Sequence, residues 1–358
     1  MKYLIYTATT LAGIALLLLS NSCTRQEQTE TVVIPDSSAI FAINHIGLTV
    51  RNLDEMLDFY RGITGFKVLD QQEISNDPAS DRLLGMKNAA YKKVVLQAPN
   101  MLFELTEFQP VQDTVIEDMP PEGPGMTHTC FQSPSWDSGY DKFIGKGLRP
   151  LSKGDHPIDI GGYGVTYAYA HDPEGNMVEL EQIDQMVLTK SGRDSSVLVD
   201  HPLWMTQVAL MSPDVDRLAD FYENLLSRTA DRRAAYKNNP KLDSIANRDS
   251  MEIKAVWIKM DGPAKMMELM QYVSPKTGPS KSQKPTDLGY HFSYETPDIR
   301  GEYLRMQKEG VELISEPQDM GKYLAFYARD VDGNLFAVRQ IKDAESPLTS
   351  KNFLFTQS

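Results

Sequence analysis

The sequence contains a strand-and-helix unit that occurs twice, and this repeat limits the folds that the chain can adopt. In residues 43–66, polar and apolar side chains alternate over 43–50, as expected for a half-buried strand. Asn52 or Asp54 can cap a following helix, whose apolar residues recur at helical spacing. Glycines near the end of the segment are expected to terminate this helix.

The second copy of this unit lies in residues 206–224. Gln207 precedes Phe221 there by the same number of residues as His45 precedes Phe59 in the first copy. A strand, a capping residue and an amphipathic helix follow one another in the same order. The chain therefore repeats one structural plan, and a glutamine stands in the second copy where the first has a histidine.

Each half of the chain also contains a second unit of this type. In the first half, one predicted strand carries His128, and another carries Glu179 directly after a predicted hairpin turn over 172–176. Glu104 lies in a further predicted strand over 101–108. These three side chains therefore belong to strands and not to loops.

The second half repeats this arrangement, with a similar turn over 330–334. At the positions that match Glu104, His128 and Glu179, the second half has Glu268, His291 and Ala337. The chain thus contains four strand–helix–hairpin units, which indicates the α+β class. Units of this kind pack together because none can bury its apolar face alone.

These repeated units resemble the vicinal oxygen chelate (VOC) superfamily, which includes glyoxalase I, methylmalonyl-CoA epimerase, extradiol dioxygenases and bleomycin-resistance proteins. The resemblance covers residues 41–340. It implies an α+β fold of four βαβββ modules paired into two glyoxalase-like domains. We expect a VOC domain with an intact ligand set over 41–184, a linker over 185–202, a second, degenerate VOC domain over 203–341 and a loose tail over 342–358.

In this superfamily the metal ligands come from the first and last strands of the modules. Carried over by position, the resemblance implies the ligands His45, Glu104, His128 and Glu179 in the first half. The second half offers Gln207, Glu268, His291 and Ala337. We expect the first-half set to bind one divalent ion (Ni, Zn, Co, Mn or Fe), because such ions accept mixed nitrogen and oxygen ligands.

The pairing of the modules stays open at this point. A swapped pairing would bring together His128, Glu179, Gln207 and Glu268, which is also a complete set and resembles the ligands of some glyoxalases. The other swapped site would contain His45, Glu104, His291 and Ala337, and it would lack one carboxylate.

The ligand set indicates lyase, isomerase or epimerase chemistry on a small oxygenated substrate. Two neighbouring substrate oxygens would bind the ion, which stabilises an enediolate, and Glu179 or Glu104 would act as the base. One alternative is an Fe(II) extradiol-type dioxygenase that uses His45, His128 and Glu179 as a two-His-one-carboxylate triad. Another is a protein that binds a small ligand without turning it over.

The first residues of the chain indicate export. Residues 1–22 carry one charge and an apolar run too short to span a bilayer, as in a signal peptide. Cys23 follows small residues, as in the lipobox of bacterial lipoproteins, and 23–40 would be a tether. We therefore expect an exported protein whose sole membrane attachment is an N-terminal lipid anchor.

The overall composition limits the partners and the use of the second cysteine. The chain has a formal net charge of −13 at pH 7 and no basic run, which argues against a nucleic-acid partner. With Cys23 lipidated, Cys130 has no disulfide partner in a monomer, and we expect it to be a buried, inert thiol.

Overall fold

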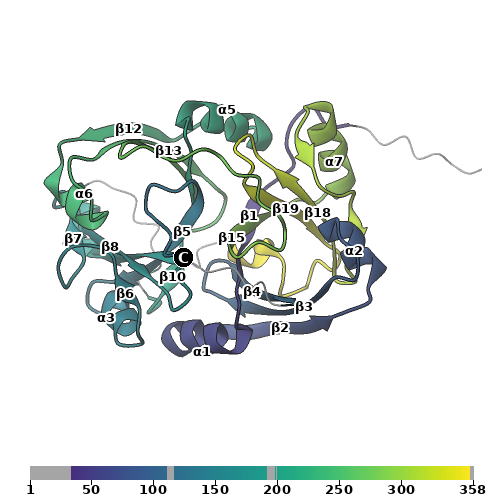
Figure 1. The fold of residues 1–358 in the computed structure, drawn as a ribbon, viewed down its shortest axis with the longest axis horizontal. Helices are drawn as coiled ribbons and strands as arrows, with labels where there is room; N and C mark the ends of the chain where they lie inside the picture. The colour runs from purple at the N-terminus through teal and green to yellow at the C-terminus, as the bar shows by residue number, and fades with distance from the viewer. Residues whose placement is uncertain (1–33, 111–116, 192–197, 199, 355–358) are drawn as a thin grey trace, which may run out of the picture. The chain divides into compact units, whose positions relative to one another are not determined.

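The computed structural model describes residues 34–110, 117–191, 198 and 200–354 (Figure 1). The predicted signal sequence, Cys23 and most of the predicted tether lie outside this part of the chain. The described residues contain four modules, in each of which a first strand is followed by a helix and further strands.

The first half of the chain contains two modules. The first comprises β1 (Ala42–Thr49), α1 (Leu53–Thr64), β2 (Lys67–Ile74), α2 (Pro78–Leu84), β3 (Ala90–Gln97) and β4 (Leu102–Gln109). The second comprises β5 (Gly125–Pro134), α3 (Gly139–Ile144), β6 (Arg149–Pro150), β7 (Ile158–Asp159), β8 (Val165–His171) and β9 (Met177–Ile183). The helix α4 (Gln185–Lys190) follows.

The second half contains the other two modules. The third comprises β10 (Trp204–Met205), β11 (Gln207–Met211), α5 (Val215–Leu226), β12 (Arg232–Lys237), α6 (Pro240–Ile245), β13 (Glu252–Lys259) and β14 (Met266–Ser274). The fourth comprises β15 (Gly289–Glu295), α7 (Ile299–Lys308), β16 (Glu312–Leu313), β17 (Gln318–Asp319), β18 (Tyr323–Arg329) and β19 (Leu335–Ile341). A 3-10 helix, η1 (Ser350–Phe353), lies near the end of the chain.

The strands form two sheets, and each sheet takes strands from both halves. Sheet A joins the first and fourth modules in the order β16-β18-β19-β15-β1-β4-β3-β2, with β17 beside β18. Sheet B joins the second and third modules in the order β12-β13-β14-β11-β5-β9-β8-β6, with β10 beside β5 and β7 beside β8. The α+β fold of paired modules is confirmed.

At the centre of each sheet, the leading strands of its two modules pair antiparallel to each other. In sheet A, β1 pairs with β15 (Figure 1). Gly47 lies opposite His291 in this pair. In sheet B, β11 pairs with β5, and Ala209 lies opposite His128. The two modules of one sequence half therefore do not build one sheet, and the swapped pairing is the one that this structure has.

Local capping explains where the repeated helices begin. Of the two possible caps of α1, Asn52 accepts a hydrogen bond from the backbone amide of Glu55. Asp214 caps α5 in the same manner, with a hydrogen bond from Arg217. Helix α1 ends at Gly65, whose φ of 69° lies in the left-handed region that favours glycine.

One apolar core contains side chains from both sheets. Phe103 of sheet A and Phe131 of sheet B are both buried in this core, and their ring centroids lie 6.1 Å apart. The hydroxyl of Tyr60 in α1 donates to Asp172 in the turn of the second module, at 2.8 Å. Because the core is shared, each module is packed against more than its sheet partner.

Two segments expected to be irregular are partly ordered. The predicted linker begins with α4, in which Leu188 is buried. The predicted tail contains η1, where Phe353 is buried and the Ser350 amide donates to Glu295 at 2.6 Å. The expectation of a loose tail is therefore wrong for the residues up to 354, because local apolar contacts and a buried carboxylate hold them.

Among the described residues, no helix is long and apolar enough to cross a membrane.

Candidate metal centre

The structure separates the four ligands expected to act together in the first half. His45 in β1 and Glu104 in β4 belong to sheet A, whereas His128 in β5 and Glu179 in β9 belong to sheet B. The expectation that these four side chains form one metal site is therefore wrong, because β1 pairs with β15 and β5 pairs with β11. The two-His-one-carboxylate triad of His45, His128 and Glu179 is divided in the same way.

Sheet B instead brings the swapped set together, and we call it the sheet B site. Its four buried side chains come from the central strands β5, β9, β11 and β14, and they are His128, Glu179, Gln207 and Glu268. The Nε2 atom of His128 lies 3.3 Å from Oε2 of Glu179 and 3.7 Å from Oε2 of Glu268. Side chains from both halves of the chain thus converge on one point.

The histidine of this site is oriented by one ring nitrogen and leaves the other unpaired. Nδ1 of His128 lies 2.9 Å from the Thr127 hydroxyl. Nε2 is fully buried and has no hydrogen-bond partner of suitable geometry, even though two carboxylates are near. A buried nitrogen without such a partner, aimed at two carboxylates, is the arrangement expected of a metal ligand.

The amide of Gln207 lies between the two carboxylates. Its Nε2 donates to Oε1 of Glu179 at 3.0 Å and to Oε2 of Glu268 at 2.8 Å. Its Oε1 lies 3.0 Å from the Thr206 hydroxyl, which donates to it. The indole of Trp257 holds the other oxygen of Glu268, at 2.8 Å.

The sheet B site holds more negative charge than its fixed cations compensate. Within the part of the chain that the structure describes, no lysine or arginine lies within 4.0 Å of Glu179 or Glu268. Burial opposes a charge on His128, but the proximity and charges of the two carboxylates raise its pKa to about 9. Two buried carboxylates around one imidazole favour a cation at this place.

Two further side chains extend the sheet B site along the same strand faces. Cys130 is fully buried, as expected, and burial raises the pKa of its thiol, so it is not an activated nucleophile. Glu181 follows Glu179 on the same face of β9. Burial and the charge of Glu179 raise the pKa of Glu181 to about 8.

A cavity of about 520 Å³ adjoins the sheet B site. Its wall includes Trp257, which bonds to Glu268, and Met266, which lies opposite Gln207 in the sheet. Glu181 contributes to the same wall. A volume of this size is typical of small-molecule sites, so the ligand set lies beside space for a substrate.

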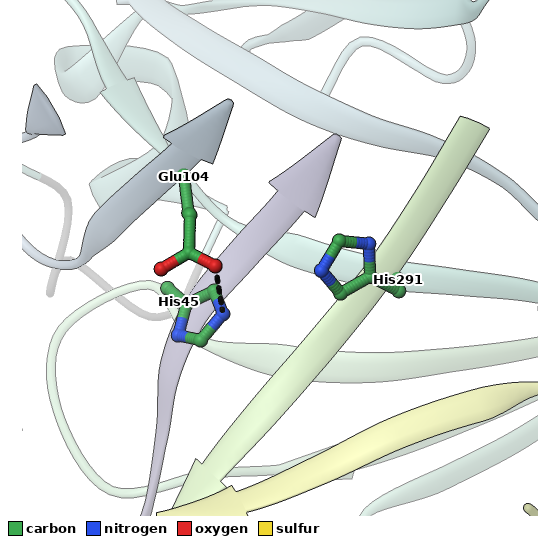
Figure 2. Close-up of side chains that lie close together, drawn as sticks. All are labelled: His45, Glu104 and His291. Atoms are coloured by element: carbon green, nitrogen blue, oxygen red, sulfur yellow. Dashed lines mark ion pairs between the residues drawn. The ribbon is translucent and has the colours of Figure 1, made fainter. Parts of the chain in front are cut away.

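Sheet A places His45, Glu104, His291 and Ala337 at the equivalent positions, which we call the sheet A site. Figure 2 shows His45, Glu104 and His291 projecting from neighbouring strands, with His45 Nε2 3.8 Å from Oε1 of Glu104. Oxygen and nitrogen atoms of these three side chains lie within 4.8 Å of one another. By composition alone, this group could also hold a metal ion.

Two fixed cations distinguish the sheet A site from the sheet B site. The guanidinium of Arg339 donates to both oxygens of Glu104, each at 3.1 Å, and Nζ of Lys93 lies 3.7 Å from Oε2. Although burial opposes it, Arg339 and then Lys93 hold the pKa of Glu104 well below its ordinary value. Glu104 is therefore already neutralised by the protein.

In the sheet A site, the pKa values of the two histidines are lowered and little free space remains. Burial and then the charge of Arg339 lower the pKa of His45, and burial lowers the pKa of His291 to about 4. The two cavities that border Glu104 have volumes of about 10 and 20 Å³, on the scale of single water molecules. The sheet A site is thus filled by side chains, whereas the sheet B site has a cavity of about 520 Å³ next to it, lined by Trp257 and Glu181 but by none of the four ligands.

Comparison with known protein families agrees with this architecture. The sequence model of the Glyoxalase/Bleomycin resistance protein/Dioxygenase superfamily matches residues 42–180 and 204–338. The chain belongs to this superfamily. Among curated protein sequences, none matches the chain significantly.

Solved structures of superfamily members share the fold. Glyoxalase I from Zea mays is 20% identical over 84% of this chain and 92% of its own, with a TM-score of 0.54. A point mutant of that protein is 19% identical over 86% of this chain and 95% of its own, with a TM-score of 0.57. A putative dioxygenase from Bacillus subtilis is 15% identical over 89% and 92%, with a TM-score of 0.56.

Three residues around the two sites of this superfamily member were not anticipated from the sequence. Arg339 follows Ala337 on the same face of β19. The sequence therefore contained a signal for it, since an alanine replaces the carboxylate of Glu179 and an arginine stands two residues later. Lys93 and Trp257 lie in strands next to the ligand strands, and no local pattern marks them. Their importance depends on cross-strand contacts.

Proposed function

We propose that this protein is a metal-dependent lyase, isomerase or epimerase of the glyoxalase type, acting on a small oxygenated molecule at the sheet B site. One observation carries the proposal: the convergence of His128, Glu179, Gln207 and Glu268 around buried carboxylates that no lysine or arginine among the described residues neutralises. Because members of this superfamily bind small molecules, we expect a small-molecule substrate for this protein as well.

The residues present fit a divalent cation. His128 would supply Nε2, and Glu179 and Glu268 would each supply a carboxylate oxygen, which together suit Ni, Zn, Co, Mn or Fe. Gln207 now points Nε2 at the carboxylates, so its amide would have to turn to present Oε1.

A bound cation would polarise a substrate carbonyl and acidify the adjacent C–H bond. We assign the role of base to Glu179. Its Oε2 lies 3.3 Å from Nε2 of His128 and accepts none of the hydrogen bonds found among the described residues, whereas both oxygens of Glu268 accept hydrogen bonds. Glu104, the other candidate base, is held by Arg339 in the sheet A site and has no part in this proposal.

The alternative functions have less support. A dioxygenase of the extradiol type requires two histidines and one carboxylate, but the sheet B site has one histidine. The sheet A site has two histidines, yet its carboxylate is bound by Arg339 and Lys93. A protein that binds its ligand without turnover would keep the metal and fail the activity test below.

Metal analysis of two matched variants tests the proposal. His128→Ala and His45→Ala remove the same atoms from a central strand of each sheet, β5 in sheet B and β1 in sheet A. We expect His128→Ala to lower the affinity for a divalent metal by at least about 100-fold, since loss of a direct ligand exceeds the effect of losing an outer partner. His45→Ala should keep the metal stoichiometry of the wild type, measured by elemental analysis after dialysis.

Catalysis is measured separately, on the wild type and on Glu179→Gln. With hydroxyacetone in D2O, the metal-loaded wild type should exchange the C–H protons next to the carbonyl, followed by proton NMR. Glu179→Gln, measured at saturating metal, should slow this exchange by at least about 100-fold, as expected for loss of a general base. Metal retained by His128→Ala but lost from His45→Ala would contradict the assignment of the site.

We also propose, from the sequence of residues 1–23 alone, that the protein is exported and lipid-anchored through Cys23. Labelled palmitate should enter the wild-type protein in bacterial cells, and Cys23→Ser should abolish the label because the acylated thiol is absent. Equal labelling of both proteins would contradict this anchor.

A further inference from the structure

We propose that Arg232 binds an anionic group of the substrate, so that the substrates of the sheet B site are small oxygenated acids. This inference rests on the proposed function, because it assigns the second binding point of the same ligand. It is carried by the position of Arg232, by the composition of the cavity wall and by the lack of an acidic partner for Arg232 in the described part of the chain.

The position of Arg232 places it beside the proposed metal ligands. Arg232 and Trp257 lie opposite each other in β12 and β13, and both line the cavity of about 520 Å³. The centre of the guanidinium is 3.6 Å from the centroid of the Trp257 ring. The same indole donates to Oε1 of Glu268 at 2.8 Å, so a single side chain separates the cation from the metal ligand.

Among the residues that the structure describes, Arg232 has no acidic partner, unlike its neighbours. Arg233 pairs with Glu223 at 2.9 Å, and Arg228 pairs with Asp261 at 2.9 Å. For Arg232, no carboxylate of the described residues lies within 4.0 Å. Stacking on an aromatic ring fixes a guanidinium in place and leaves its N–H groups available for a carboxylate or phosphate.

The other charged residues of the cavity wall are Asp231, Glu181, Lys259 and Lys265. Each of them already has an interaction partner, Lys259 included, which leaves this role to Arg232. Asp231 accepts a hydrogen bond from the Lys259 amide, and Glu181 accepts one from the Gln132 amide group, so both carboxylates are engaged. Lys265 is buried, and its Nζ donates to the Ile43 carbonyl at 3.4 Å.

The rest of the wall is mainly apolar. It includes Val165, Ile183, Leu188, Met260 and Met266. Such a surface favours an organic body between the two polar ends of the ligand. The protein as a whole carries a net charge of −13, so overall electrostatic attraction would not bring an anion to this cavity, and a local cation such as Arg232 is needed.

Two bidentate chelators that differ in one group test this inference. Succinic monohydroxamic acid carries a carboxylate, and the corresponding monoamide hydroxamate has the same length without the charge. Titration calorimetry on the metal-loaded full chain should show the acid binding about tenfold more tightly than the amide, as expected for one charge-assisted contact. In Arg232→Met the two chelators should bind equally, with the affinity for the amide unchanged.

Arg233→Met serves as the control, because Arg233 is adjacent in sequence and lies on the other face of β12. It should keep the preference for the acid. Equal binding of both chelators to the wild type, or a preference that survives in Arg232→Met, would overturn the role of Arg232 alone. If neither chelator binds the metal-loaded protein better than the metal-free protein, the proposed function fails, and this inference fails with it.

Discussion

Glu181 in β9 and Arg339 in β19 occupy equivalent positions in the two sheets, opposite Gln132 and Glu295 respectively. In sheet A, Arg339 reaches Glu104 and supplies the positive charge that the buried carboxylate needs. In sheet B, the same position carries another carboxylate, and no arginine of the described residues pairs with Glu179. Arg339, together with Lys93, thus neutralises the buried carboxylate of sheet A from within the protein.

At the residue scale, Arg339→Met should lower the free energy of unfolding by about 3 to 5 kcal/mol, because it leaves the buried carboxylate of Glu104 without its main partner. Denaturant unfolding measures this loss. The double variant Glu104→Gln/Arg339→Met should be more stable than Arg339→Met, since no buried charge is left unpaired. Arg339→Met with wild-type stability would show that Lys93 alone neutralises Glu104.

At the element scale, the central strand pairs position the ligands. The β1–β15 register puts Gly47 opposite His291, and a Cβ on Gly47 would lie 2.2 Å from Nε2 of that ring. In sheet B, the corresponding position opposite His128 is Ala209. The His291 ring therefore lies directly over the backbone of β1, a position that only glycine permits here. The same strand plan produces a packed site in one sheet and a site beside a cavity in the other.

At the scale of the whole molecule, the swapped pairing makes each sheet depend on both halves of the chain. The pairs β1–β15 and β5–β11 both cross between the halves. If the chain is cut at an engineered protease site between residues 191 and 200, the two fragments should remain associated and co-elute in size-exclusion chromatography. The reason is that separation would break the centre of both sheets and expose the shared core. Elution as two separate folded fragments would contradict this arrangement.

The sequence by itself determined the local features of this protein. The repeat, the four modules and the strands that carry His128, Glu179, Gln207 and Glu268 follow from periodicity, capping and turn residues, which act over a few neighbours. The ordered tail escaped prediction because Ser350 is held by Glu295, which is distant in the sequence.

Only the tertiary structure decided which modules pair. All four first strands have similar alternation, and a strand edge does not specify which of several similar strands will join it. Packing across the whole chain made that choice, and with it the division of the ligands between two sheets. The state of Glu104 was decided in the same way, since Arg339 comes from the opposite end of the chain. Charge compensation in a buried site depends on proximity in space, which the order of residues does not contain.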